Sequence, residues 1–278
     1  MKSKKNSISP PFRWAGGKQD LLKTITNKLN RAPESNGYHE LFAGASSIFF
    51  NLKNVKRATL SDINQELILT LQAIKDSPVE LMLELDKLNH LKDRAGFLEV
   101  RAWDRQETFK SLSDIQRAAR FLFLQALGYN GLWRENLSGQ YNTSYGQNDQ
   151  KSLYTESIIM TCHEKLSNVE IVHSPFTDRF DFIEKGDRVY LDPPYIPVTS
   201  SKFNYSGGGF SHDDQMKLKE GLHIISEIGA HFVLSNSDCA ATRALYKEFK
   251  IRTVSTRRNI GKTTASRKKV TEVLVSNY

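Results

Sequence analysis

The segment between residues 38 and 62 constrains the fold of this chain more than any other. It opens at residues 38–41, where we expect a short strand that leads into a turn. A turn of small residues follows at 42–46, and apolar side chains at 48–52 are spaced as on the buried face of a helix. A second strand is expected at 58–60. A strand, turn, helix and strand in this order begin an α/β sheet of the kind that binds nucleotides.

The rest of the chain divides into a helical stretch and a return to strands. Between residues 66 and 153 leucines recur at helical spacing, and strand signals are absent until the aromatic, glycine-rich stretch 128–146. That stretch indicates a hairpin or an extended loop. Further strands are expected at 169–172, 188–191, 232–234 and 273–275, and a helix at 213–228. We therefore predict an α/β fold with a mostly helical insertion.

The composition is ordinary for a globular protein but has a basic bias. Lys and Arg number 39 against 31 Asp and Glu, and the net charge of +8 suits a polyanionic partner, although many basic proteins bind no nucleic acid. Cys162 and Cys239 form no CxxC pair, so two reduced thiols are expected rather than a zinc site, and a single disulfide stays open. No apolar run has the length of a membrane span. We expect a cytoplasmic protein without membrane or metal.

The tetrapeptide Asp192-Pro193-Pro194-Tyr195 follows the expected strand 188–191, at the edge where open α/β sheets carry their active sites. It suits a planar amine whose lone pair is delocalised into a ring. Acceptors that hold both N–H groups turn the lone pair outward, and Asp192 offers a carboxylate while the prolines offer carbonyls on a stiff backbone. The ring of Tyr195 offers a stacking surface for an extruded base. Alone, these residues are equally typical of a turn that ends a strand.

Two further segments have the composition of a cofactor site. A loop that contains glycines and basic residues ends at Lys18 and leads into an amphipathic helix. The turn at 42–46 allows backbone amides to approach a ligand closely, although it is no GxGxxG and a plain tight turn is an equal alternative. Asp62 ends the second expected strand, where a carboxylate commonly holds ribose hydroxyls. Capping of the next helix is the alternative role for Asp62, and the two roles are compatible.

Together these motifs resemble those of the Dam-like N6-adenine DNA methyltransferases, the alpha group of the D12 class. The matching segments span nearly the whole chain: 12–18 (cofactor loop), 40–46 (turn), 128–137 (DNA-reading hairpin), 192–195 (catalytic tetrapeptide), and 257–260 with 267–270 (C-terminal strands). The resemblance implies a Rossmann-like sheet that depends on S-adenosylmethionine. This catalytic domain would lie in two parts, 1–65 and 154–278, and a helical target-recognition domain at 66–153 would interrupt it.

The resemblance also implies roles for individual residues in catalysis. S-adenosylmethionine would be bound by Trp14, Gly16, Gly17, Lys18, Glu40, Phe42, Gly44, Ser46, Asp62, Phe176 and Asp192. An adenine flipped out of the duplex would be held by Asp192, Pro193, Pro194 and Tyr195. Transfer would be direct, without a covalent enzyme intermediate and without a metal.

Other residues would contact double-stranded DNA: Arg13, Tyr129, Asn130, Leu132, Arg134, Arg257, Lys262, Arg267 and Lys268. Tyr129 would fill the place of the extruded adenine, Arg134 would read a guanine, and Leu132 would meet a thymine methyl. Arg13 stands where the family has a lysine that reads the first guanine, a combination that favours GATC. Core packing for Tyr129 and Leu132, a phosphate contact for Arg134 and a solvated face at 257–269 are the alternatives.

Several positions depart from the family pattern. Ser46 replaces the second glycine of the turn, Leu41 replaces a proline, and Pro175 stands where aspartate is common. Ser144 and Gln147 replace a proline and an arginine of the hairpin, which weakens the GATC prediction more than the methyltransferase prediction. An N4-cytosine or RNA methyltransferase and a non-catalytic DNA-binding regulator are the alternative functions. We expect a monomer in solution.

Overall fold

The computed structural model describes residues 7–32, 36–197, 210–257 and 269–278. The chain divides into two compact units. The helical unit comprises Met1–Gly17, Gly44–Asn51 and Asn64–His173, and the sheet unit comprises Lys18–Ala43, Leu52–Ile63 and Ser174–Tyr278. The boundaries predicted at residues 66 and 153 stay a prediction.

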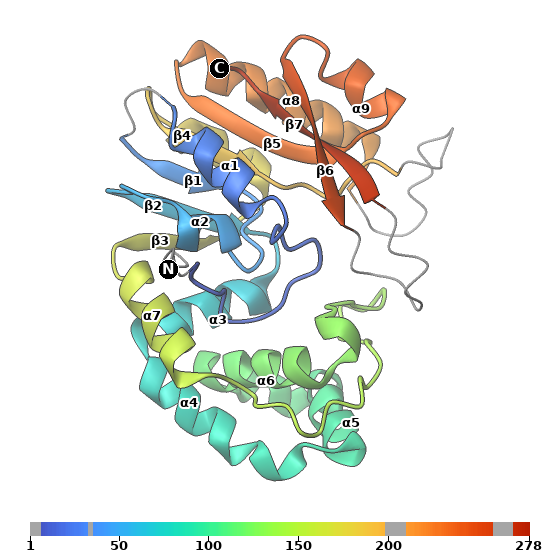
Figure 1. Ribbon diagram of the computed structural model, residues 1–278. Coiled ribbons are helices and arrows are strands. Elements are labelled where there is room, and N and C mark those ends of the chain that lie inside the picture. The colour runs from blue at the N-terminus through green and yellow to red at the C-terminus, as the bar shows by residue number, and fades with distance from the viewer. Residues whose placement is uncertain (1–6, 33–35, 198–209, 258–268) are drawn as a thin grey trace, which may run out of the picture. The chain divides into compact units, whose positions relative to one another are not determined.

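The strands of the sheet unit lie in the order β2-β1-β4-β5-β7-β6. Their bounds are Tyr38–Glu40 (β1), Ala58–Asp62 (β2), Arg188–Leu191 (β4), His231–Ser237 (β5), Lys250–Arg257 (β6) and Lys269–Ser276 (β7). The first four strands of this order are parallel, and β7 runs antiparallel between β5 and β6 (Figure 1). The remaining strand of the described sheet, β3 (Val169–His173), belongs to the helical unit by sequence. The α/β prediction is confirmed.

The helices of the sheet unit pack on the sheet through their apolar residues. The sheet unit holds α1 (Leu22–Leu29), the 3-10 segment η5 (Phe176–Phe182), α8 (His212–Glu227) and α9 (Ala240–Leu245). Ser211 and Asp214 form a capping box that starts α8. Leu218 and Leu222 of α8 are fully buried in one core with strand residues such as Phe232.

The helical unit is built around α6 (Asp114–Leu127), which begins at a capping box of Ser113 and Gln116. The other elements are α2 (Ser47–Asn51), α3 (Gln65–Asp76), α4 (Pro78–Lys87), η1 (Asn89–Leu91), α5 (Arg94–Ala102), η2 (Trp103–Arg105), η3 (Glu107–Ser111), η4 (Tyr129–Gly131) and α7 (Glu156–Leu166). Helix α6 packs against α3, α4 and α5 (Figure 1), and Phe121 and Phe123 are completely buried. Among the described residues, no helix has the length and apolar character needed to cross a membrane.

The stretch that the sequence left as a hairpin or loop is a hairpin, which we call the recognition hairpin (residues 132–143). The N–H of Asn142 on one arm donates to the Arg134 carbonyl on the other (2.8 Å). Glu135 and Tyr141 face each other in an isolated antiparallel β-bridge. The side-chain oxygen of Asn136 accepts hydrogen bonds from the N–H groups of Ser138 and Gln140, and Leu137 in this turn is fully exposed. The hairpin is therefore held by side chains and single bridges instead of a long ladder.

Candidate active site

The tetrapeptide lies at the carboxyl end of β4, between the parallel neighbours β1 and β5. Pro193 is buried, and the carbonyl of Pro194 accepts a hydrogen bond from Gln215 of α8 (3.2 Å). The N–H of Ile196 donates to the side-chain oxygen of Asn236 on β5 (3.1 Å). These bonds fix the backbone on both sides of Tyr195, at the sheet edge where the sequence predicted a site.

Asp192 is oriented by a lysine that comes from a distant part of the chain. The Nζ of Lys18 lies 2.6 Å from Asp192 Oδ2, and the side chains are 8% and 21% exposed. The other oxygen, Oδ1, is buried and has no hydrogen-bond partner among the described residues. Burial raises the pKa of Asp192, while the charge and hydrogen bond of Lys18 act in the opposite direction. The carboxylate is thus fixed through one oxygen and offers the other as an acceptor.

Tyr195 is held by its hydroxyl group and by its ring. The hydroxyl donates to Glu272 Oε2 (2.7 Å), and the Nζ of Lys18 lies 5.0 Å from the ring centroid. Burial raises the pKa of Tyr195, so the hydroxyl stays protonated and remains a donor. Glu272 lies on β7, opposite Ser237 of β5. The sequence prediction missed Glu272, although an acidic residue within the apolar run 270–275 is an available signal.

Three aromatic rings of the sheet unit form a cluster. Phe42 and Phe176 stack with centroids 5.3 Å apart, and Phe210 contacts both. The structure thus brings together two residues predicted to bind the cofactor. Phe176 is 8% exposed, so most of its ring is committed to this cluster.

The carboxylates predicted for the cofactor occupy the ends of neighbouring strands. Glu40 is 1% exposed and accepts the Tyr38 hydroxyl (2.6 Å). Asp62 ends β2 and is half-buried. The cap of α3 is Asn64, whose side chain accepts from the Leu67 N–H (2.9 Å), so the alternative role of Asp62 as a helix cap is wrong.

The helical unit holds the glycine-rich part of the predicted cofactor set. The N–H of Gly17 donates to the Trp14 carbonyl (3.1 Å), and Gly16 has a φ of +81°. Gly44 has a φ of +48°, and a Cβ there would lie 2.7 Å from Trp14 Cδ1. Ser46 also adopts a positive φ, 51°, so it keeps the backbone conformation that a glycine at this position of the family turn favours.

Most residues predicted to contact DNA surround the start of the recognition hairpin. Tyr129 is 44% exposed, Asn130 and Arg134 are also exposed, and Leu132 is half-buried. Arg13 approaches this region, because a Cβ on Gly131 would lie 3.1 Å from Arg13 Cβ. Core packing of Tyr129 is therefore wrong as an interpretation.

The remaining basic residues are only partly placed. Arg257 ends β6, its side chain is not described, and Lys262, Arg267 and Lys268 lie outside the described residues. Within the described ranges, no group of three or more His, Cys, Asp or Glu side chains is arranged to hold a metal ion. Cys162 and Cys239 are both free.

Comparison with known proteins identifies the family. Residues 14–260 match the model of the D12 class N6 adenine-specific DNA methyltransferases. The chain is 33% identical to the type II methyltransferase M1.LlaDCHI of Lactococcus lactis over all of its own length and 98% of that protein. It is also 33% identical to the DNA adenine methylase of Escherichia coli K12, over 95% of this chain and 93% of that one. The chain therefore belongs to the D12 class of N6 adenine-specific DNA methyltransferases, enzymes that use S-adenosylmethionine.

Proposed function

We propose that this enzyme methylates N6 of an adenine that has been flipped out of duplex DNA, and that the adenine lies in GATC. The proposal rests on the different surroundings of the two carboxylate oxygens of Asp192. Lys18 fixes one carboxylate oxygen, and the other is buried at a sheet edge without a described partner. A buried acceptor without a donor is costly unless a ligand supplies the donor, and an extruded amino group does so.

Two groups of the tetrapeptide accept the two N–H groups of the adenine amine. Asp192 Oδ1 accepts one N–H of the adenine amino group. The carbonyl of Pro194 already accepts from Gln215, so we assign the second acceptor to the carbonyl of Pro193. With both N–H groups held, the nitrogen lone pair turns out of conjugation and toward the methyl donor. Tyr195 stacks on the base, and Glu272 keeps the ring in place.

The residues present fit S-adenosylmethionine. Asp62 lies at a strand end, where ribose hydroxyls are commonly held, and the cluster of Phe42 and Phe176 offers an apolar surface for an adenine ring. We assign cofactor binding to the predicted set, namely Trp14, Gly16, Gly17, Lys18, Glu40, Phe42, Gly44, Ser46, Asp62, Phe176 and Asp192. When bound, the cofactor supplies an electrophilic methyl group on a sulfonium, so the protein supplies only position and acceptors.

The target sequence is read, in this proposal, by the hairpin and by Arg13. The exposed ring of Tyr129 fills the gap left by the adenine, and Arg134 and Arg13 each read a guanine through a guanidinium fork. Leu132 meets a thymine methyl. Asn130 and the basic residues Arg257, Lys262, Arg267 and Lys268 contact the DNA backbone, which the net charge of +8 supports.

Several organisational features belong to the same proposal. Residues 66–153 form the target-recognition domain, and 1–65 with 154–278 form the catalytic domain. The enzyme acts as a monomer, without a metal, in the cytoplasm. Relatives named type II methyltransferases suggest a partner restriction enzyme, whereas those named DNA adenine methylase suggest a solitary enzyme.

The test combines a map of methylated sites with one substitution. The chain is expressed in a host without adenine methylation, and N6-methyladenine is mapped in plasmid DNA. We expect methylation of GATC by the wild type. We expect the turnover number of Asp192→Ala to fall by at least about 100-fold, with duplex affinity nearly unchanged because the basic surface remains. Asp192→Asn, which keeps one oxygen and the volume of the side chain, serves as the folding control.

Each part of the proposal has an outcome that contradicts it. Methylation at another motif overturns the target, and N4-methylcytosine overturns the choice of base. Unimpaired turnover by Asp192→Ala overturns the assigned acceptor. A wild type that binds DNA but neither methylates it nor binds S-adenosylmethionine by calorimetry is a regulator on this scaffold.

A further inference from the structure

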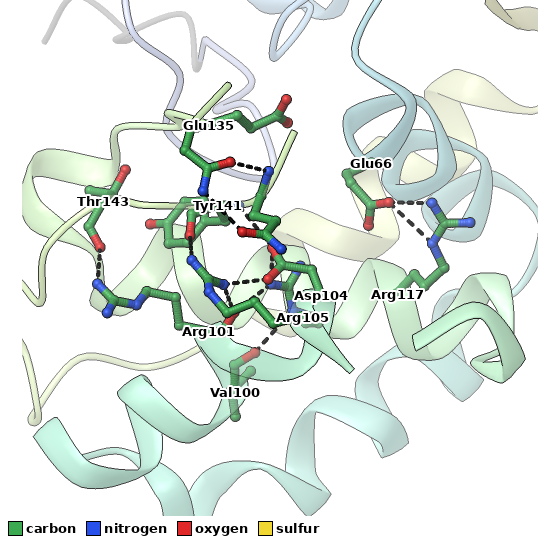
Figure 2. Close-up of polar contacts among 12 residues, drawn as sticks. Glu66, Val100, Arg101, Asp104, Arg105, Arg117, Glu135, Tyr141 and Thr143 are labelled. Atoms are coloured by element: carbon green, nitrogen blue, oxygen red, sulfur yellow. Dashed lines mark hydrogen bonds and ion pairs between the residues drawn. The ribbon is translucent and has the colours of Figure 1, made fainter. Parts of the chain in front are cut away.

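Asp104, in the 3-10 turn η2, holds one arm of the recognition hairpin by its backbone. Its Oδ2 accepts the N–H of Tyr141 at 2.8 Å (Figure 2). The neighbouring Arg105 donates from Nη2 to the carbonyl of the same Tyr141 at 2.7 Å, and its Nη1 also contacts Asp104 Oδ1. The two side chains therefore satisfy both backbone polar groups of Tyr141, as a neighbouring strand would do.

Asp104 is itself held in place by a buried arginine of α6. The Nη2 of Arg120 lies 2.8 Å from Asp104 Oδ2, and the side chains are 1% and 9% exposed. Arg120 also donates from Nε to the Val100 carbonyl (3.0 Å) and from Nη2 to the Arg101 carbonyl (2.9 Å) at the end of α5. Burial lowers the pKa of Arg120, and Asp104 opposes that shift. The pair thus joins α5, α6 and the hairpin at one point.

The anchored arm determines where the opposite arm lies. The N–H of Asn142 donates to the Arg134 carbonyl (2.8 Å), and Thr143 Oγ1 donates to the Leu132 carbonyl (3.0 Å). These two partners are the residues to which base reading is assigned. The ring of Tyr141 packs on Trp133 between them, with centroids 4.7 Å apart. A shift of Tyr141 is therefore passed to both base-reading positions.

We infer that Asp104 is a specificity-positioning residue, which sets the placement of Leu132 and Arg134 through Tyr141. The inference rests on the proposed reading of DNA by this hairpin. A bidentate contact to a guanine depends on the direction of the guanidinium fork, whereas phosphate contacts tolerate displacement. A looser hairpin therefore loses discrimination between sequences before it loses binding or methyl transfer.

The chain offers a matched control on the same helix. Arg117, one turn before Arg120 on α6, pairs with Glu66 of α3, and their side chains are 20% and 14% exposed (Figure 2). This pair also joins two helices, but none of its contacts given by the described residues reaches the recognition hairpin. The charge of Glu66 acts on Arg120 less strongly than that of Asp104 does, so loss of this charge has a structural cost with little effect on base reading.

The experiment compares the full-length variants Asp104→Asn, Glu66→Gln and Arg134→Ala with the wild type. For each, kcat/KM is measured on duplexes that carry the mapped target and on duplexes with one target base replaced. We expect Asp104→Asn to reduce the ratio of target to altered duplex by about tenfold, in the direction of Arg134→Ala, with a smaller loss on the target itself. We expect Glu66→Gln to keep the wild-type ratio, even if it lowers the melting temperature as much as Asp104→Asn does.

A second variant addresses folding. Asp104→Leu combined with Arg120→Leu removes both members of the buried pair and, unlike Asp104→Asn, leaves no side-chain acceptor at position 104 for the Tyr141 N–H. Arg105, whose side chain is 32% exposed, keeps its hydrogen bonds to the Arg101 and Tyr141 carbonyls. It is expected to lower the ratio in the same way. If the ratio is unchanged in both Asp104 variants but lowered in Arg134→Ala, the inference about Asp104 is overturned, while base reading by the hairpin stands. An unchanged ratio in Arg134→Ala overturns base reading by the hairpin, and with it the inference.

Discussion

Asp192 and Tyr195 each depend on one charged partner from outside the tetrapeptide. Lys18 holds the Asp192 carboxylate, and Glu272 accepts the hydroxyl of Tyr195. Lys18 is buried and Glu272 is half-buried, and hydrogen bonds to charged groups are stronger than those between neutral groups. The orientation of the acceptor and of the stacking ring therefore depends on residues that do not contact the base in this proposal.

The first prediction concerns the bond between Tyr195 and Glu272. Tyr195→Phe keeps the ring but loses the hydroxyl, and Glu272→Val loses the acceptor. We expect each single substitution to lower kcat by about tenfold, since a hydrogen bond to a charged group contributes roughly 1.5–3 kcal/mol. The double variant is expected to be no slower than the slower single variant, because both remove the same interaction. Single-turnover rates of the four proteins test this, and additive losses contradict it.

At this scale the sequence predicts residues but not their pairs. Asp192, Lys18 and Tyr195 were predicted from local motifs, each beside a strand or a helix start. Their contacts were not predictable, because the partners are far apart in the chain and only the strand order brings them together. Glu272 was missed for the same reason, since its role depends on the register of β7 against β5.

The turn between β1 and α2 shows how an element constrains single positions. Gly44 has a positive φ, and Trp14 fills the space where a side chain would begin. Gly139, at the tip of the recognition hairpin, also has a positive φ, +73°, but no described atom lies within 4 Å of its Cβ position. Substitutions at these two positions therefore distinguish the energetic cost of the backbone conformation from the cost of a steric clash.

The second prediction compares Gly44→Ala with Gly139→Ala. Gly139→Ala bears only the cost of the left-handed conformation, about 1–2 kcal/mol of unfolding free energy. Gly44→Ala adds the displacement of Trp14 and is expected to lose a further 1–3 kcal/mol or so. It is also expected to weaken S-adenosylmethionine binding. Urea unfolding and calorimetry measure both effects, and equal losses for the two variants contradict the close packing of Trp14 on Gly44.

Element prediction succeeded where burial was strong and failed where it was weak. Strands β4 and β5 were predicted because they contain apolar runs and are almost wholly buried. Strand β1 is also buried, and it was predicted from its place before the turn of small residues. Strand β6 was not among the strands expected from apolar runs, since it starts Lys250-Ile251-Arg252-Thr253 and is largely exposed. An edge strand buries little apolar surface, so its sequence carries little signal.

At the scale of the whole molecule, the amino ends of the strands carry a buried ionic cluster on the sheet unit. Asp187, which is fully buried before β4, accepts hydrogen bonds from His39 Nε2 (2.9 Å), Arg57 Nη2 (3.1 Å) and the Glu184 N–H (3.0 Å). These partners come from β1, from the chain before β2 and from the turn before β4. The cluster therefore ties three parallel strands together at the edge opposite the tetrapeptide.

The last prediction follows from the ionisation of Asp187. Burial alone would raise the pKa of Asp187, but the hydrogen bonds from His39 and Glu184 and the charge of Arg57 hold it below its ordinary value. A carboxylate whose pKa is lower in the folded state adds stability at pH values above its unfolded pKa, about 3.9, and that stability is lost as pH falls through the folded pKa. Asp187→Asn is thus expected to be less stable than the wild type by about 1–3 kcal/mol between pH 5 and 7. The difference narrows as pH falls below about 4, because Asp187 binds a proton in the unfolded wild type before it does so in the folded one. Urea unfolding across this range measures it, with the exposed Asp181→Asn as the control that changes nothing. A constant difference down to pH 3 or so would show that Asp187 acts through packing and not through its charge.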